Sequence, residues 1–225
     1  WMRDYDKAIL YSGKLMDLKR YSLLKGTEFA QVCADGTTSE NIWTMKWSYQ
    51  NNKQNWIIYM MCRTAAPQMI PSEGVKNLWN TEEYRVDLRR YQTIDTTIVY
   101  ASNHISSPNG DASIWKWQPG ERVIEANEKY VPFYRYADIL LLRAEALNKQ
   151  QRQEEALELL NMIRERAGLS LKTMDDFTNA SDRTLAMEDA ILQERQLELL
   201  GEGRRWFDLI RTGRAMKVMN DYFEN

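Results

Sequence analysis

Two glutamates four residues apart, Glu194 and Glu198, are the side chains in this sequence whose type and spacing come nearest to catalysis. Paired carboxylates can act as acid and base when a glycosidic bond is hydrolysed. A general acid needs a raised pKa, however, and cations close by would lower the pKa of both groups. Those cations are Arg195, Arg204, Arg205 and Arg211. The glutamate pair is therefore predicted to be structural, and a glycoside hydrolase remains only an alternative function.

The other reactive side chains form no catalytic or metal-binding pattern. His104 is the single histidine, so it has no second histidine with which to bind a transition metal. Cys33 and Cys62 lack C-x-x-C spacing, and the sequence leaves open whether they form a disulfide or stay reduced. No phosphate loop or dinucleotide fingerprint occurs. No cofactor is predicted, although a calcium site of oxygen ligands needs no fixed spacing and stays open.

The aromatic residues support binding better than the charged residues support catalysis. Carbohydrates present flat C–H faces and many hydroxyl groups, so a site for them needs exposed aromatic rings beside hydrogen-bonding side chains. The irregular middle of the chain offers both kinds of residue, most of them around one polar loop. The residues predicted to contact a sugar are Trp47, Tyr49, Asn52, Asn55, Trp56, Tyr59 and Trp115.

Each tryptophan could instead belong to the core, because an aromatic side chain in a domain of this size is more often buried than exposed. Core positions are favoured for Trp43, Trp47, Trp79 and Trp206. Trp56, beside the polar loop, is the best candidate for an exposed platform. Trp115 and Trp117 share one strand face, and one of the two could be exposed.

Residues 1–133 are predicted to be irregular and rich in aromatic residues, with short strands. Ile42–Tyr49 alternates apolar and polar residues, as a strand with one apolar face does. Trp56–Met61 is a possible hairpin partner for this strand. Tyr91–Tyr100 has the composition of a further strand.

Two helices are predicted within the same part of the chain. Trp1–Leu18 has the pattern of an amphipathic helix that is broken or kinked at Gly13. Glu73–Trp79 is expected to be a short helix with Ser72 as its N-cap.

Residues 134–225 are predicted to be helical. Apolar residues recur at helical spacing on both sides of a short link, Lys149–Gln153, so two antiparallel helices are expected there. Ala144 and Ala156 stand where a tetratricopeptide repeat has small residues. The expected caps are Gly168 for the second helix and Asp182 or Thr184 for the last long helix. The predicted fold class is mainly α: a tetratricopeptide-like helical hairpin and a C-terminal helix clamp, with a small β-hairpin and long irregular loops.

The tail, Ala190–Arg214, is predicted to fold as a helix, an elbow and a second helix. Glu194 and Glu198 fall on the apolar stripe of the first helix, where they need cationic partners because like charges at that spacing repel. Gly201 and Gly203 would turn the chain. The residues predicted to hold this clamp together are Glu194, Glu198, Arg205 and Trp206.

Three motifs in the helical part resemble the SusD/RagB family. They are RYADILLLRAEALN (Arg135–Asn148), EEALELLNMIRERAGL (Glu154–Leu169) and the tail pattern E-R-x-x-E-L followed by E-G-x-R-W-x-D-L-x-R-x-G. Their order is that of the family, and together they cover Tyr134–Gly213. Gly201 departs from the family pattern, which has a larger residue such as Phe at that position.

The resemblance implies a cell-surface lipoprotein of the outer membrane that binds an oligosaccharide or polysaccharide. Such proteins lie as lids on a SusC-like TonB-dependent transporter and pass the glycan to it. Residues 1–225 would then be a single C-terminal domain of a longer protein, attached to the membrane only by an N-terminal lipid anchor that this chain does not contain. The main alternative is a helical-repeat scaffold that binds another protein and whose aromatic residues all lie in the core.

Charge and hydropathy argue against two other classes of protein. The 225 residues carry a formal net charge of -2 and have a pI near 5.7, which gives no electrostatic basis for binding nucleic acid. No apolar run approaches the length of a membrane-spanning helix.

Overall fold

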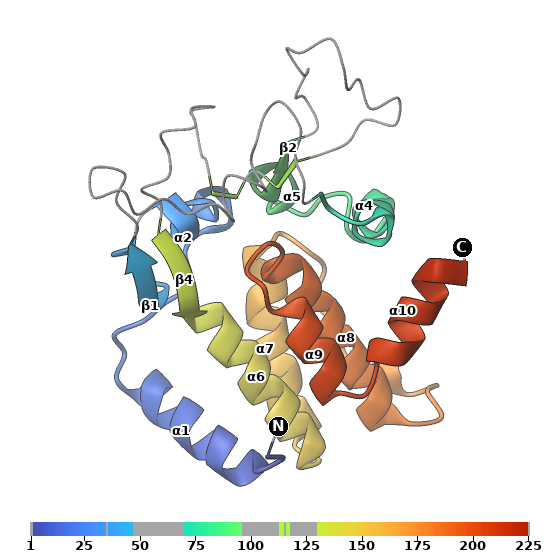
Figure 1. The fold of residues 1–225 in the computed structure, drawn as a ribbon. Coiled ribbons are helices and arrows are strands. Elements are labelled where there is room, and N and C mark those ends of the chain that lie inside the picture. Colours follow the sequence, from blue (N-terminus) through green and yellow to red (C-terminus); the bar gives the residue numbers. More distant parts are fainter. Residues whose placement is uncertain are drawn as a thin grey trace. The chain divides into compact units, whose positions relative to one another are not determined.

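A computed structural model of the chain describes residues 2–34, 36–46, 70–95, 113–114, 116–117 and 130–224. Helices dominate these residues, which confirms the mainly helical fold class (Figure 1). The chain divides into two compact units. The first, here called the helical unit, comprises Trp1–Leu18, Ala137–Ile163 and Lys172–Asn225. The second, the mixed unit, comprises Lys19–Tyr136 and Arg164–Leu171.

The helices of the helical unit form where apolar residues recur at helical spacing. They are α1 (Tyr5–Asp17), most of α6 (Tyr136–Lys149) and α7 (Gln153–Arg166), η3 (Met174–Phe177), α8 (Arg183–Glu198), α9 (Arg205–Arg211) and α10 (Ala215–Glu224). The predicted link between α6 and α7 is confirmed, because α6 ends at Lys149 and α7 begins at Gln153. Asp182 is the N-cap of α8, and its carboxylate accepts a hydrogen bond from the backbone N–H of Leu185 (3.0 Å).

The helix that was predicted to be broken or kinked at Gly13 has no break there, since α1 runs continuously from Tyr5 to Asp17. The reason lies in a neighbouring guanidinium group. Arg143 donates hydrogen bonds to the backbone carbonyl of Ile9 and to Ser12 Oγ (3.1 Å). A Cβ atom on Gly13 would lie 3.1 Å from Arg143 Nη1, so glycine here makes room for the arginine and does not end the helix.

The mixed unit joins short helices to two small antiparallel sheets. Its elements are η1 (Gly26–Glu28), α2 (Gln31–Ala34), β1 (Asn41–Lys46), α4 (Glu73–Asn80), α5 (Arg90–Thr93), β2 (Ile94–Asp95), β3 (Ser113–Ile114) and β4 (Tyr130–Arg135). β1 pairs with β4, and β2 pairs with β3. The described part of the predicted strand Ile42–Tyr49 is confirmed as β1, whereas its predicted hairpin partner, Trp56–Met61, lies outside the described residues. The start of the predicted strand Tyr91–Tyr100 is helical instead, and Ile94–Asp95 is the extended part that the structure describes.

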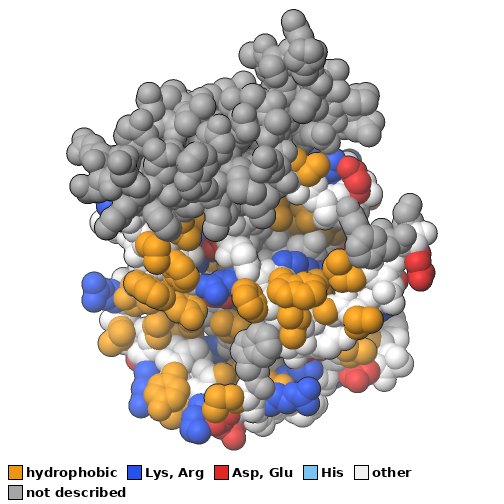
Figure 2. All heavy atoms as spheres, viewed as in Figure 1, with side chains coloured by type: hydrophobic (Ala, Val, Ile, Leu, Met, Phe, Trp, Pro, Cys, Tyr) orange, Lys and Arg blue, Asp and Glu red, His pale blue; other side chains and the backbone are white. Residues whose placement is uncertain are grey.

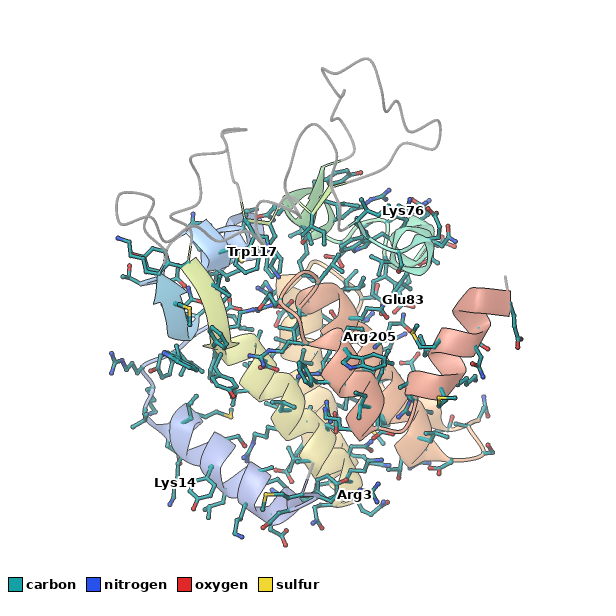
Figure 3. The ribbon with its side chains drawn as sticks, in the orientation of Figure 1. Arg3, Lys14, Lys76, Glu83, Trp117 and Arg205 are labelled. Atoms are coloured by element: carbon teal, nitrogen blue, oxygen red, sulfur yellow. The ribbon has the colours of Figure 1, made fainter. Side chains whose placement is uncertain are left out.

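Trp79 and Trp117 lie in the core of the mixed unit. Trp79, at the end of α4, is fully buried, as predicted, and its indole N–H donates to Asp87 Oδ2 (3.1 Å). The same carboxylate pairs with the buried Arg89 guanidinium (2.7 Å). Trp117 lies beside α2 and packs against Val32 (Figure 3). The other buried members of its cluster are Cys33 and Ile114. Cys62 lies outside the described residues.

Candidate functional site

The residues predicted to contact a sugar are not among those that the structure describes. Trp47, Tyr49, Asn52, Asn55, Trp56, Tyr59 and Trp115 all lie outside the described residues, so this part of the site stays a prediction. The structure does describe Trp43, which was predicted to lie in the core, and two aromatic side chains on the strand paired with it.

Three aromatic side chains on the β1–β4 sheet are exposed together. Trp43 is 54% exposed, Tyr134 is 44% exposed and Phe133 is 36% exposed. Hydrophobic side chains gather at the surface over these two strands in Figure 2. We call Trp43, Phe133 and Tyr134 the aromatic surface. The prediction that Trp43 belongs to the core is wrong, because the strand turns its large apolar residues away from the interior.

Irregular strand pairing explains why these three side chains share one face. Trp43 lies opposite Tyr134, but the next pair along β1 is Thr44 with Pro132, so Phe133 has no partner. Successive side chains of a regular strand point to opposite faces. A bulge changes that direction locally, and both Phe133 and Tyr134 are therefore exposed. A second irregularity, at Ile42, separates Trp43 from the pair that Asn41 forms with Arg135.

The rings of the aromatic surface contact one another. The Trp43 and Phe133 ring centroids are 4.8 Å apart with a 35° angle between the planes, and those of Trp43 and Tyr134 are 6.1 Å apart at 23°. Mutual contact restrains each ring, so little side-chain entropy is left to lose when a ligand stacks on it. An exposed indole with aromatic neighbours can bind the C–H face of a sugar, and the Tyr134 hydroxyl adds a polar group to the same surface.

A buried ion pair joins the ends of the two strands that carry the aromatic surface. Glu40, one residue before β1, pairs with Arg135, the last residue of β4, at 2.6 Å between Oε1 and Nη1. Both side chains are buried. Their backbones also meet, because the N–H of Tyr136 donates to the Glu40 carbonyl (2.8 Å). The strand ends that carry Trp43 and Tyr134 are thus held together by side-chain and backbone contacts.

The helical unit contains an ion network centred on Asp208, in the tail that the family signature covers. Asp208 is buried on α9 and accepts from Arg195 Nε (2.9 Å) and Arg211 Nη2 (2.7 Å). Arg195 also contacts Asp138 on α6 (2.8 Å), and Arg211 also contacts Glu145 on α6. Arg195 and Arg211 were predicted to serve Glu194 and Glu198, whereas the carboxylates they contact here are Asp208 on α9 and two on α6, which the tail sequence alone could not reveal. The predicted pairing with Glu194 and Glu198 stays a prediction.

The electrostatics of this network hold Asp208 in its charged form. Burial alone raises the pKa of the Asp208 carboxyl, but the charges of Arg195 and Arg211, and their hydrogen bonds, outweigh burial and leave that pKa below its ordinary value. Arg205, labelled on α9 in Figure 3, has its charged form disfavoured instead. Burial lowers the pKa of the Arg205 guanidinium, and the positive charges of Arg214 and Arg195 lower it further. The negative charge of Asp208 raises this pKa but does not outweigh the other effects. Arg205 donates a hydrogen bond to the backbone carbonyl of Leu192 on α8 (3.2 Å), and its role in holding the clamp together stays a prediction.

Two further predictions for the tail have different outcomes. Glu194 and Glu198 are both fully buried, as expected for structural carboxylates on the apolar stripe of α8. A catalytic pair must reach its substrate, so their burial argues against a hydrolase that uses them. The prediction that Trp206 is a core residue is wrong: Trp206 is 52% exposed and Phe207 is 51% exposed on α9. The core of the clamp is ionic and aliphatic, and Leu209 supplies its buried apolar side chain from α9.

Other features of the described residues do not mark a catalytic centre. A pocket of about 360 Å³ is lined by Asp6, Ile9, Leu10, Gln150 and Arg152. Its polar groups already pair, Gln150 with Asp6 (3.1 Å) and Arg152 with Glu155 (2.6 Å). Within the described ranges, no group of three or more His, Cys, Asp and Glu side chains is arranged to hold a metal ion. No helix in that part of the chain has the length and apolar character to span a membrane.

Comparisons with known proteins agree on one family. The family model described as the SusD family matches residues 38–225. SusD-like protein P38 of Formosa agariphila is 53% identical over 89 residues, which are 38% of this chain and 18% of that protein. A crystal structure of a SusD homolog from Bacteroides thetaiotaomicron has a TM-score of 0.71 and 27% identity, covering 93% of this chain and 45% of its own.

A third comparison shows likeness of fold. Surface glycan-binding protein A from Bacteroides uniformis has a TM-score of 0.67 and 23% identity, and the match covers 93% of this chain and 45% of that protein. The chain therefore spans less than half the length of each of these two solved structures.

Proposed function

Because the chain belongs to the SusD family, we propose that it is part of a cell-surface protein that binds glycans without making or breaking covalent bonds. The observation that carries this proposal is the aromatic surface. It combines an exposed indole, two neighbouring rings and a hydroxyl group, which is the kind of surface that stacks on sugar rings and hydrogen-bonds to them. The name of the similar Bacteroides uniformis protein, a surface glycan-binding protein, supports the same ligand class.

The proposed cellular setting follows from the family resemblance. The full-length protein would be held at the outer surface of the outer membrane by an N-terminal lipid anchor. It would work with a SusC-like TonB-dependent transporter and pass oligosaccharides to it during nutrient uptake. The predicted loop residues, with Trp56 foremost, would extend the binding site beyond the aromatic surface.

Isothermal titration with a panel of plant, host and bacterial glycans tests the proposal. A sugar that stacks on one indole face removes on the order of 60 Å² of apolar surface from water, about 1.5 kcal/mol and roughly a tenfold change in affinity. Trp43→Ala should therefore weaken binding of the recognised glycan about tenfold with an unchanged melting temperature. Trp56→Ala should do the same if the predicted loop contributes.

The matched control is Trp206→Ala, because Trp206 is exposed to nearly the same extent as Trp43 but belongs to the helical unit. Its glycan affinity should equal that of the unchanged protein. Equal affinities for the Trp43 and Trp206 variants would remove the aromatic surface from the binding site. Absence of binding to every glycan in the panel would count against the function itself.

A protein-binding scaffold is the second candidate, favoured by the exposed Trp206 and Ile210 side chains on α9. In that case the helical unit would contact another protein, such as the transporter. Purified transporter that binds the unchanged protein and not the Trp206→Ala variant, with glycan affinity intact, would support this role.

A further inference from the structure

The Glu40–Arg135 ion pair, at the ends of β1 and β4, is given no role by the family description or by the names of the relatives. We propose that Glu40 and Arg135 are positioning residues of the aromatic surface: they fix the strand register at which Trp43, Phe133 and Tyr134 share one exposed face. This inference rests on the proposed glycan-binding function only where it concerns the effect of the ion pair on glycan affinity. The effect of the ion pair on the position of the Trp43 ring can be measured without a ligand.

Both oxygens of the Glu40 carboxylate are engaged, and each contact ties β1 to a different segment. Oε1 accepts from Arg135 Nη1 at the end of β4 (2.6 Å). Oε2 accepts from the backbone N–H of Leu24 (3.0 Å) and lies 3.5 Å from Arg166 Nη1. A single carboxylate thus fixes the start of β1 against three separate segments of the mixed unit.

The Arg135 guanidinium is held from a second side. Its Cζ lies 5.7 Å from the centroid of the Phe29 ring, within the distance at which a cation is attracted by an aromatic ring. Phe29 is fully buried. The Arg135 side chain is therefore restrained both by the Glu40 carboxylate and by the Phe29 ring. These contacts also restrain the backbone at the end of β4.

The geometry of paired strands explains why restraining the ends of β1 and β4 affects the aromatic surface. The two irregularities in the pairing of β1 with β4 lie between the Asn41–Arg135 pair and the Thr44–Pro132 pair. A shift of one residue would send the side chains of one strand to the opposite face. β1 and β4 are short and contain two irregularities, so their backbone hydrogen bonds specify the register weakly. The Glu40–Arg135 ion pair, at one end of the paired strands, therefore fixes the register that the backbone hydrogen bonds specify only weakly.

The residue types also favour positioning over stability. A buried ion pair contributes little net stability compared with a well-packed apolar pair of the same size, because both charges lose their hydration. An ion pair with both carboxylate oxygens engaged is, however, far more directional than apolar packing. Directional restraint is what a bulged pair of short strands needs.

The first test is spectroscopic and uses the whole chain labelled with 5-fluorotryptophan. Trp43→Phe identifies the fluorine resonance of Trp43, and Glu40→Gln is then compared with the unchanged protein. We expect Glu40→Gln to shift or broaden the Trp43 resonance while the resonance of the buried Trp79 stays in place. Asp87→Asn, which disturbs another buried carboxylate–arginine pair of the same unit, is the matched control. It should move Trp79, whose indole N–H contacts Asp87, and leave Trp43 unmoved.

The second test is affinity for the recognised glycan. Glu40→Gln should weaken binding about tenfold, as Trp43→Ala does, and should cause no further loss when combined with Trp43→Ala, because both changes act through the same contact. Arg135→Lys keeps the charge but not the planar two-pronged donor, so its affinity should fall between those of Glu40→Gln and the unchanged protein.

The outcomes separate the inference from the proposed function. If no glycan binds but Glu40→Gln displaces the Trp43 resonance, the function fails and the positioning role holds. If glycans bind and Glu40→Gln changes neither the resonance nor the affinity, the positioning role is overturned and the function holds. If Glu40→Gln does not fold, Arg135→Lys provides both readouts, and an unchanged Trp43 resonance in that variant would equally overturn the inference.

Discussion

Replacing Asp208 by asparagine is the sharpest perturbation of the helical unit. The Asp208 carboxylate is buried and accepts three hydrogen bonds from two guanidinium groups: one from Arg195 Nε (2.9 Å) and two from Arg211, Nη2 (2.7 Å) and Nε (3.0 Å). Asparagine has nearly the same shape but carries no charge and has one acceptor oxygen in place of two. Asp208→Asn therefore removes an anion from between the buried Arg195 and the partly exposed Arg211 while leaving packing almost unchanged.

The expected loss of stability can be worked from these contacts. Breaking a buried ion pair by removing one partner costs about 3–5 kcal/mol, since the remaining charge is left uncompensated. Here each cation keeps another carboxylate, because Arg195 still contacts Asp138 (2.8 Å) and Arg211 still contacts Glu145. The loss should therefore lie near the lower end, about 3 kcal/mol.

Urea unfolding at pH 7, followed by circular dichroism at 222 nm, measures this loss. The matched control is Asp189→Asn, since Asp189 also pairs with an arginine, Arg214, at 2.6 Å, but its side chain is 60% exposed. An exposed pair contributes about 0–1 kcal/mol, so the control should unfold close to the unchanged protein. A loss for Asp208→Asn of less than about 1 kcal/mol, equal to that of the control, would refute the network as a source of stability.

The same variant predicts a dependence on pH. The pKa of the Asp208 carboxyl is lower in the folded protein than in the unfolded chain, so its charge adds stability that is complete above the unfolded pKa, about 4. That stability is lost as the pH falls through the lower, folded pKa. The difference between the unchanged protein and Asp208→Asn should thus be constant from pH 7 to about pH 5 and should shrink below about pH 4. A difference that stays constant into acid would mean that shape, and not charge, causes the loss.

Two further predictions concern helix ends and use the same urea measurement. Gly168 has a φ of +74°, and a Cβ there would lie 3.2 Å from Leu88 Cγ, whereas Gly203 has a φ of +73° with nothing within 4 Å. Gly203→Ala should therefore cost about 1 kcal/mol for backbone strain alone, and Gly168→Ala about 2 kcal/mol; equal losses would mean that the contact with Leu88 has no effect. Asp182→Ala should cost about 1 kcal/mol, because the Leu185 N–H at the start of α8 loses its acceptor, and a midpoint identical to that of the unchanged protein would show that water replaces the cap.

Helices and their ends were predictable because their determinants are local. The Ser72 cap of α4 was predicted from residues within one turn of the helix end, and its hydroxyl accepts from the Val75 N–H (3.4 Å). The Asp182 cap of α8 and the link between α6 and α7 are of the same kind. The left-handed Gly168 after α7 also follows from local chemistry, since the Leu169 N–H reaches back to the Arg164 carbonyl (2.9 Å).

Strand partners and exposed faces were not predictable, because they depend on residues distant in sequence. β1 pairs with β4, whose strand character was not recognised next to the helical motif that begins at Arg135. The alternation in Ile42–Tyr49 does show which residues share a face, but an apolar face can lie in the core or serve as a binding platform. Trp43 was therefore assigned to the wrong side. The bulge at Phe133 could not be foreseen from either strand alone.

The tail shows how far charge patterns can be used in such a prediction. Glutamates on an apolar stripe imply buried ion pairs, and Glu194 and Glu198 are indeed buried. The tail arginines were expected to serve these two glutamates, yet Arg195 and Arg211 meet at Asp208 and extend to α6. A guanidinium group presents several donors in a plane, so Arg195, on α8, can join a carboxylate from α6 and one from α9 at once. The charged residues of the tail motif therefore fix α8 and α9 against α6. This structural role explains why the motif contains many charged residues that form buried ion pairs.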